Sequence, residues 1–386
     1  KMQDQYHWYF VQIEMNYQDW RHARAPRNVN AEYLYEELDK RELPIVIMEP
    51  LQGGRLTKPA QNVVNRLKER GLDKQFTINS WARKFSDGDH GIASWLKLAN
   101  LVAGSEYIFV DDHVPMFDWL PLIDTRLIQT WHAGAGFKSS GYSRWGHMGG
   151  PGPISCHRQY SYGLCGSRKI AHFFSEVWGI NTGMPRMDEF QDEAHKGKTI
   201  KALYEQFPLC KGKKVILFAP TYRGRSNRDA HYPYELIDWE RLDSVCGDEY
   251  VVLFKMHPWV IKDIKIPERY SSRMIDVKHY PNINDLFYIT DILITDYSSN
   301  IYEYSLMRRP MLFFAFDEVQ YSFSRGFHRP YRESAPGKVC ATFDELMDAI
   351  SNRDFEFEKV EKYVTTQFDH FDSDACDRVI DWLLLG

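Results

Sequence analysis

The chain has 386 residues, and at about 150 residues per domain this length predicts two to three domains. Hydrophobic residues make up 44% of it, yet no apolar run approaches the ~20 residues that a membrane-spanning helix needs, so an integral membrane protein is excluded. The formal net charge of -5 argues against a nucleic-acid binder that acts through bulk electrostatics.

Strand-like runs alternate with helical patterns along almost the whole chain. Helical patterns cover, for example, Ala31–Arg41, Ile92–Val102 and Thr199–Phe207. This alternation predicts parallel α/β layers. The runs VILFAP and VVLFKM are almost wholly apolar, as strands buried on both faces are. In chain order, the strand-like runs are Phe10–Met15, Pro44–Met48, Gln75–Asn79, Tyr107–Val110, Arg126–Thr130, Lys214–Ala219, Tyr250–Lys255, Ile292–Thr295 and Pro310–Phe316.

Two stretches interrupt this alternation. Residues 187–212 are charged and lack an apolar strand, which predicts an exposed helix and a hinge between two α/β domains. Residues 134–166 are rich in glycine and serine, and a loop of this length in a compact domain is usually functional or disordered. We therefore expect the boundary between two α/β domains near residue 195, which gives domains at 73–195 and 196–386.

The six cysteines lie far apart in the sequence and form no CxxC pair. This spacing argues against a disulfide framework or a structural zinc site and favours a reducing compartment. The cysteines are Cys156, Cys165, Cys210, Cys246, Cys340 and Cys376.

From about residue 75 to residue 386 the chain contains, in this order, QTWHAGAGFKSSGYSRWG, TGMPRMDEF, LFAPTYRG, FKMHP, ITDYSSNIYEYSLMRRPMLFFAFD and RGFHRPYRESAPG. In order and spacing these stretches resemble the CDP-glycerol glycerophosphotransferase family, the teichoic-acid polymerases and their relatives. The resemblance implies a glycosyltransferase-B-like α/β fold, in which two Rossmann-like domains face each other across a cleft. It also implies transfer of glycerol phosphate from CDP-glycerol to a hydroxyl group.

The first 72 residues resemble a different family. WYFVQIEMNYQDW, NAEYLYEELDKRELPIVIMEPLQGGRL and VVNRLKER look like later strands of an aldo/keto reductase barrel. A complete barrel takes roughly 250 residues, so reductase activity is rejected. The transferase-like part lacks the opening strands of its first domain, which is therefore expected to be incomplete. We expect the N-terminal segment to be an α/β appendage whose strands Phe10–Met15 and Pro44–Met48 dock there.

His132 follows the strand-like run RLIQT and precedes small residues, which places it at the carboxyl edge of a sheet, where ligands bind in open α/β folds. An imidazole titrates near neutral pH and can take a proton from a hydroxyl. The resemblance implies that His132 is the catalytic base. The alternative is a histidine bonded within its own loop.

His257 follows the strand VVLFKM in the same way, and Lys255 lies two residues earlier on the same side of the extended chain. The resemblance implies that His257 contacts the donor phosphates. Lys255 is predicted to bind the donor too, although a core-bridging or solvated lysine fits the pattern as well.

Further donor-binding residues are predicted in two other loops. Asp296, Ser298 and Ser299 lie between an apolar strand and a helical pattern, where hydroxyl groups cap a helix and its free amides attract phosphate. Glu303 is predicted to accept hydroxyls of the ribose or glycerol, with a plain surface glutamate as the alternative. Thr221 and Arg223 follow the strand VILFAP, where a forked guanidinium suits a phosphate.

The acceptor is expected at the glycine-rich loop, because Lys138, Ser140 and Arg144 combine cations with a hydroxyl. The same mixture also suits a membrane surface. The sequence contains no HExxH or HxH pattern, phosphate loop of the GxxxxGK[ST] type or GxGxxG fingerprint, so neither a metal nor a cofactor is expected.

The sequence therefore predicts an enzyme that transfers glycerol phosphate from CDP-glycerol to a teichoic-acid-like polymer or a lipid-linked primer and releases CMP. It is expected to act peripherally on the cytoplasmic face of a bacterial plasma membrane, without a nucleic-acid partner. One alternative is a glycosyltransferase-B enzyme with another donor, CDP-ribitol or a nucleotide sugar. Another is an inactive nucleotide-binding remnant.

Overall fold

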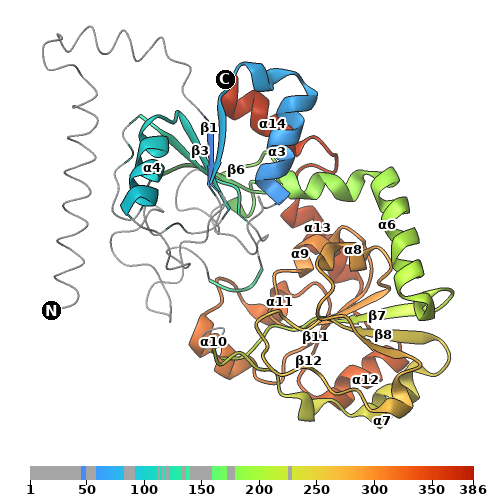
Figure 1. The fold of residues 1–386 in the computed structure, drawn as a ribbon. Helices are drawn as coiled ribbons and strands as arrows, with labels where there is room; N and C mark the ends of the chain where they lie inside the picture. Colours follow the sequence, from blue (N-terminus) through green and yellow to red (C-terminus); the bar gives the residue numbers. More distant parts are fainter. Residues whose placement is uncertain are drawn as a thin grey trace, which may run out of the picture. The chain divides into compact units, whose positions relative to one another are not determined.

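The computed structural model forms two compact units, which are treated separately below (Figure 1). Unit 1 comprises Lys1–His132, Gly150–Asp188 and Asp372–Gly386, and unit 2 comprises Ala133–Gly149 and Glu189–Phe371. The structure describes residues 45–48, 58–81, 92–111, 114, 117, 122, 124–131, 136–139, 159–171, 179–224 and 228–386.

Unit 1 is built on a six-stranded parallel sheet with the order β2-β1-β3-β4-β5-β6. Its strand β1 lies inside the sheet, since Ile45 pairs with Ile78 of β2 and Val46 with Ile108 of β3. The predicted docking of the strand at Pro44–Met48 is thus confirmed, whereas Phe10–Met15 lies outside the described residues. The strands are β1 (Ile45–Met48), β2 (Ile78–Trp81), β3 (Tyr107–Val110), β4 (Arg126–Gln129), β5 (Tyr160–Leu164) and β6 (Gly179–Ile180).

Both faces of this sheet are covered by helices, which explains why β3 is apolar throughout. Tyr107 and Phe109 pack with α3 (Lys58–Glu69), while Ile108 and Val110 pack with α4 (Ile92–Ala103). Successive side chains of a strand point to opposite faces, so a strand with two covered faces favours apolar residues on both sides.

The last residues of the chain return to unit 1 and pack on α3. They form α14 (Ala375–Val379) and a π-helical turn at Ile380–Leu384, whose apolar side chains join the α3 core. Asp188 ties this segment down, because its carboxylate accepts hydrogen bonds from the amides of Ala375 and Cys376 at 3.0 and 2.9 Å. Burial raises the pKa of Asp188 to about 6, although these two amides oppose the shift.

Unit 2 contains a second six-stranded parallel sheet, with the order β12-β11-β10-β7-β8-β9. Its central strands pair in register, from Lys214 with Tyr250 to Phe218 with Phe254. The strands are β7 (Lys214–Phe218), β8 (Tyr250–Phe254), β9 (Met274–Asp276), β10 (Ile292–Thr295), β11 (Met311–Phe314) and β12 (Lys338–Cys340). The predicted α/β class with parallel sheets is confirmed in both units.

Helices cover both faces of the second sheet (Figure 1). On one face α7 and α12 pack together over a core that includes Ile216, Val252 and Leu312. On the other face α9 contacts α8 and α13. The helices of unit 2 are α6 (Glu193–Gln206), α7 (Trp239–Cys246), α8 (Ile283–Phe287), α9 (Ile301–Ser305), α10 (Glu318–Arg325), α11 (Tyr331–Ser334), α12 (Phe343–Ser351) and α13 (Glu358–Gln367).

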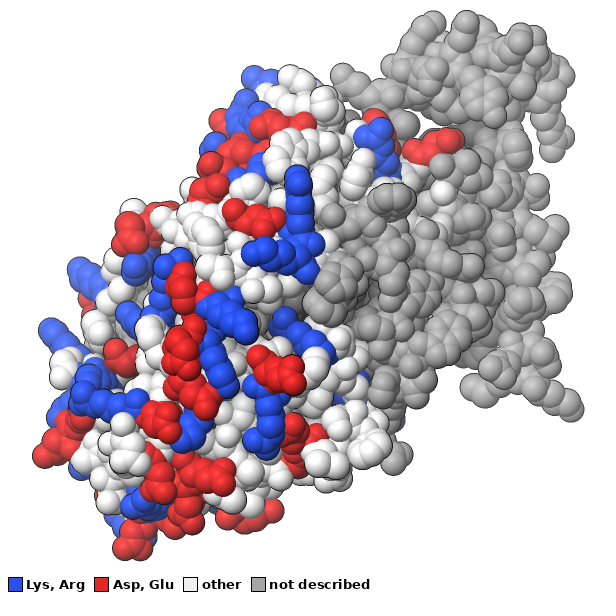
Figure 2. Space-filling model, turned by 180° about the vertical axis from the view of Figure 1, so that it is seen from behind, with Lys and Arg blue, Asp and Glu red and all other residues white. Residues whose placement is uncertain are grey.

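The surface of the described residues mixes both signs of charge. On the face that Figure 2 shows, lysine and arginine side chains alternate with aspartate and glutamate, and neither sign gathers into a broad patch. Among the described helices, none is long and apolar enough to cross a bilayer.

Candidate functional site

Most predicted donor-binding residues that the structure describes meet at one edge of the unit 2 sheet. Thr221 and Arg223 follow β7, His257 follows β8, and Asp296 follows β10. Because these strands are parallel, their carboxyl ends share an edge, and ligands of open α/β sheets bind there. The structure adds Asp317, which follows β11 at the same edge.

Arg223 is the centre of a buried ion cluster. Its Nε and Nη2 donate to the two carboxylate oxygens of Asp317 at 2.6 and 2.8 Å, and Nη1 donates to Asp296 at 2.9 Å. The side chain of Arg223 is 11% exposed and that of Asp296 is fully buried. Burial disfavours the guanidinium charge, but the carboxylates of Asp296 and Asp317 outweigh this effect and raise the pKa of Arg223. Four aromatic rings surround the guanidinium at 4.8 to 6.0 Å, those of Tyr232, Tyr297, Phe316 and Tyr321.

Asp296 binds the backbone as well as Arg223. Its Oδ1 accepts hydrogen bonds from the amides of Thr221 and Tyr297 at 2.8 and 2.6 Å. In the structure Arg223 and Asp296 pair with each other, and the donor contact that the sequence predicts for them stays a prediction. They join the loops that follow β7, β10 and β11.

The hydroxyl of Thr221 lies in this cluster without a partner. The residue is 4% exposed, and its Oγ1 has no hydrogen-bond partner among the described residues. Buried hydroxyls are normally hydrogen-bonded, so an unmatched one at a ligand-binding edge is suited to a ligand oxygen.

His257 is held by the turn in which it lies. Its Nδ1 accepts a hydrogen bond from the amide of Trp259 at 3.1 Å. Burial, and then the nearby charges of Lys138 and Lys255, lower the pKa of His257 to about 4. The ring is therefore neutral at pH 7, and since Nδ1 is an acceptor, Nε2 carries the proton. This arrangement offers a hydrogen-bond donor to a phosphate oxygen.

Lys255 has a structural partner instead of a ligand-facing position. It is 8% exposed, and its ammonium donates to the backbone carbonyl of Lys278. Burial lowers the pKa of Lys255. The core-bridging alternative thus describes Lys255 in this structure better than the predicted donor contact.

A short segment of the glycine-rich loop lies over the same edge. Lys138 forms an antiparallel bridge with Phe327, and the amide of Ser139 donates to the carbonyl of Gly326 at 3.1 Å. At Gly136, a Cβ atom would lie 3.2 Å from the Cα of Ser299, so a larger residue would crowd the two loops. Lys138, predicted to serve the acceptor, is therefore close enough to His257 to influence its charge.

The remaining predicted donor residues lie around α9. The Oγ of Ser298 accepts from the amide of Asn300 at 3.4 Å, a local turn contact. Glu303 is 3% exposed, so the alternative of a plain surface glutamate is wrong. Glu303 lies on α9, which packs against α8 and α13.

The strand that leads to His132 ends in a constrained turn of unit 1. Trp131 has a φ of 53°, which is unusual for a residue other than glycine. Its amide donates to the side chain of Gln129 at 3.0 Å, and Gln129 donates to the hydroxyl of Tyr160 at 3.0 Å. Strained backbone of this kind clusters at functional sites. His132 itself, Ser140 and Arg144 lie outside the described residues.

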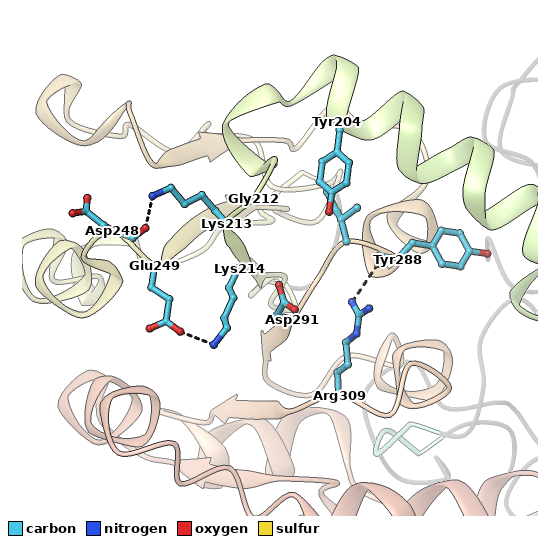
Figure 3. A pocket seen from close by; sticks show the side chains of 10 residues that line it. Tyr204, Gly212, Lys213, Lys214, Asp248, Glu249, Tyr288, Asp291 and Arg309 are labelled. Atoms are coloured by element: carbon cyan, nitrogen blue, oxygen red, sulfur yellow. Dashed lines mark hydrogen bonds and ion pairs between the residues drawn. The ribbon is translucent and has the colours of Figure 1, made fainter.

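A pocket of about 430 Å³ lies at the opposite, amino edge of the unit 2 sheet (Figure 3). Lys214, at the start of β7, pairs with Glu249 at 2.5 Å, and Nη1 of Arg309 donates to the carbonyl of Tyr288 at 3.2 Å. Lys213 donates to the carbonyl of Asp248. Lys213, Lys214, Glu249 and Arg309 are therefore paired with one another or with the backbone. The position of the pocket is not the one where open α/β sheets bind ligands.

Comparison with known proteins identifies the family. The profile of the CDP-Glycerol:Poly(glycerophosphate) glycerophosphotransferase family matches residues 46–385. The chain belongs to this family. The match begins within β1, so the glycerophosphotransferase family extends into the segment that resembles an aldo/keto reductase.

Two curated relatives differ in the polymer that their names state. The teichoic acid ribitol-phosphate polymerase TarL of Staphylococcus aureus is 39% identical over 327 residues, which cover 82% of this chain and 58% of that protein. The teichoic acid poly(glycerol phosphate) polymerase of Staphylococcus epidermidis is 32% identical over 232 residues, which cover 59% of this chain and 31% of that protein. The chain thus spans little more than half the length of the first relative and about a third of the second.

A solved structure supports the same fold. The wall teichoic acid polymerase TagF has a TM-score of 0.67 at 22% identity, and the match covers 90% of this chain and 91% of that chain. At this identity the likeness shows the fold alone. It confirms the glycosyltransferase-B-like class that the sequence predicts.

Proposed function

We propose that this chain is a polyol-phosphate transferase of teichoic acid synthesis and that its donor is CDP-ribitol. The observation that carries this proposal is the match to the ribitol-phosphate polymerase, with 39% identity over 82% of the chain. The match to the glycerol-phosphate polymerase reaches 32% over 59%. CDP-glycerol, the donor that the sequence motifs first suggest, is the second candidate.

In the proposed reaction a hydroxyl of the acceptor attacks the β-phosphorus of the donor. The new P–O bond forms as the bond from that phosphorus to the bridging oxygen breaks, and CMP leaves with the electron pair. Such reactions depend chiefly on positioning and charge neutralisation. His132, which follows Trp131 in the sequence, takes the proton of the attacking hydroxyl.

The carboxyl edge of unit 2 holds the diphosphate in this proposal. His257 donates from Nε2, Lys138 adds positive charge, and the unmatched hydroxyl of Thr221 adds a further hydrogen bond. Arg223 and Asp296 act as positioning residues, because they fix the loops that carry these groups. Ser298, Ser299 and Glu303 complete the donor side, and Ser299 lies next to Gly136.

The acceptor is proposed to be a lipid-linked or polymeric polyol phosphate, held by Lys138, Ser140 and Arg144. Such an acceptor would bring the chain to the cytoplasmic face of a membrane as a peripheral protein. These assignments follow the family and the residue types of the glycine-rich loop.

The test measures CMP release by the purified chain from CDP-ribitol and from CDP-glycerol, with a teichoic-acid primer as acceptor. We expect turnover with CDP-ribitol and at least about tenfold lower kcat/KM with CDP-glycerol, a difference of about 1.4 kcal/mol. Faster turnover with CDP-glycerol would reverse the donor assignment. CMP binding without turnover of either donor would instead support an inactive nucleotide-binding remnant.

A further inference from the structure

Residues 326–329, which we call the loop clamp, hold residues 136–139 of the glycine-rich loop within unit 2. Nε2 of His328 donates to the backbone carbonyl of Gly136 at 2.7 Å, and Nη2 of Arg329 donates to the same carbonyl at 3.2 Å. A carbonyl can only accept, so Nε2 of His328 carries the proton in this contact. Two side chains of the clamp thus meet at one carbonyl of the loop.

Phe137 anchors the same segment in the core of unit 2. It is 0% exposed, and its ring lies 4.7 Å from that of Tyr331 and 5.8 Å from that of Phe313. Its carbonyl accepts a hydrogen bond from the amide of His328 at 3.1 Å. The guanidinium of Arg329 lies 5.9 Å from the centre of the Phe137 ring. The buried ring and the bonded carbonyl together fix the register of the segment.

This register determines where Lys138 points. The antiparallel bridge between Lys138 and Phe327 shows that the segment is extended, and neighbouring side chains of an extended segment point to opposite sides. Since Phe137 points into the core, Lys138 points away from it. Burial is the main cause of the low pKa of His257, and the charge of Lys138 is the next, so the two side chains lie near each other. A shift of one residue would turn Lys138 to the opposite side.

We propose that His328 and Arg329 are positioning residues of the transferase, which hold Lys138 beside His257 for the transfer of the polyol-phosphate group. This inference rests on the proposed function, in which Lys138 supplies positive charge to the diphosphate. A cation stabilises the charge of a phosphoryl-transfer transition state best when it is fixed in advance. The stem of a lysine side chain is flexible, so the backbone that carries Lys138 has to be held in place.

The test measures kcat for transfer to a teichoic-acid primer at saturating donor, together with the affinity for CMP. His328→Ala removes the contact with Gly136 and should lower kcat by about 10- to 100-fold, because a small misplacement of a catalytic group is costly. CMP lacks the transferred phosphorus, so its affinity should stay at the parental value. His328→Gln, which keeps a hydrogen-bond donor, should retain most of the parental kcat. His231→Ala is the matched control, because the His231 ring also contacts a backbone carbonyl of unit 2, that of Asp229 at 3.0 Å.

A double variant shows whether His328 acts through Lys138. Lys138→Met removes the charge, so the addition of His328→Ala to this variant should lower kcat no further. A full additional loss in the double variant would mean that His328 acts on something other than Lys138, and it would overturn the inference. If His328→Ala does not fold, Arg329→Met tests the same point, because Arg329 donates to the same carbonyl.

The outcomes separate this inference from the proposed function. If the parent chain is active and His328→Ala has the parental kcat, the loop clamp does not position Lys138, although the transferase remains. A parental kcat with weaker CMP binding would assign the clamp to nucleotide binding and overturn the inference. If the parent chain transfers from neither CDP-ribitol nor CDP-glycerol, the proposed function fails, and the inference fails with it.

Discussion

The two edges of the unit 2 sheet use the same kinds of charged side chain in different surroundings. At the carboxyl edge, Arg223 is 11% exposed and pairs with Asp296 and Asp317, which are 0% and 14% exposed. At the amino edge, Lys214 and Glu249 meet at 2.5 Å while 47% and 45% of their side chains remain exposed. The exposed pair is as short as the buried ones or shorter, at 2.5 Å against 2.9 and 2.6 Å, so a short distance does not mark the buried pairs.

Burial determines what each pair does for the protein. Water and salt screen an exposed pair, and such pairs contribute little to stability. A buried charge has lost its hydration, so its partners become indispensable even when the cluster adds little net stability. The ion cluster thus fixes the loops at the carboxyl edge, where the donor site is proposed, whereas the charges at the amino edge keep the surface hydrated.

The largest expected effect follows from removing the central charge of the buried cluster. Arg223→Met leaves Asp296 and Asp317 without a counter-ion, and breaking a buried pair in this way costs about 3–5 kcal/mol of unfolding free energy. Urea unfolding of the parent and the variant measures this loss.

Arg241→Met is the matched control for this prediction. Arg241 pairs with Asp348 at 2.6 Å, but these side chains are 41% and 59% exposed. The control should lose no more than about 1 kcal/mol. If Arg223→Met does not fold, Arg223→Lys tests the same point, because lysine keeps the charge but loses the forked contact with Asp317. Equal stability of Arg223→Lys and the parent would contradict the argument.

The sequence predicts most strands of this sheet because they are buried on both faces. VILF, YVVLF, ILIT and MLFF are apolar runs, and each forms a strand in the structure. Residues that follow parallel strands lie at the same edge of the sheet, so their sequence positions also place Thr221, His257 and Asp296 at one edge. In the structure each of them follows a strand of the parallel unit 2 sheet.

The sequence does not predict the partners of these residues. Asp317 pairs with Arg223 across 94 positions of sequence, and no local pattern carries such a contact. The sequence indicates Asp317 in one way: it follows directly after an apolar strand-like run, as Asp296 follows β10. The alternation of side chains along a strand predicts the side to which Lys255 points. It does not predict that the ammonium of Lys255 reaches the backbone carbonyl of Lys278. Glu303 is buried, and its burial depends on tertiary packing that no local pattern carries.

The second prediction concerns the donor that is proposed to bind at the carboxyl edge. His257→Ala removes a hydrogen bond to a charged phosphate, so CMP affinity should fall by about 10- to 100-fold. His195→Ala is the control, because His195 is also half-buried but lies on α6. Isothermal titration with CMP measures both variants. If His257→Ala binds CMP as the parent does, the diphosphate lies elsewhere.

The third prediction uses the neutral state of His257. Its folded-state pKa is about 4, below the usual 6.5, so between these values the unfolded chain binds a proton that the folded chain does not. The contribution of His257 to stability is therefore present above pH 6.5 and is lost as the pH falls towards 4. Urea unfolding at pH 7 and pH 5 should show a smaller loss in His257→Gln than in the parent. Identical losses would mean that the folded protein does not hold His257 in its neutral form.

The smallest effect is expected at the amino edge. Lys214→Met removes the partner of Glu249, but both side chains are about half exposed, and water replaces the lost contact. The urea midpoint should therefore stay at the parental value, and CMP affinity should not change, because the proposed donor site lies at the other edge. Repeating the urea unfolding at low and high salt sharpens this comparison. Any small effect of the exposed pair on stability should vanish at high salt, because salt screens the pair. A loss of CMP affinity in Lys214→Met that exceeds the loss in His257→Ala would move the donor site to the amino edge and reverse the assignment of the two edges.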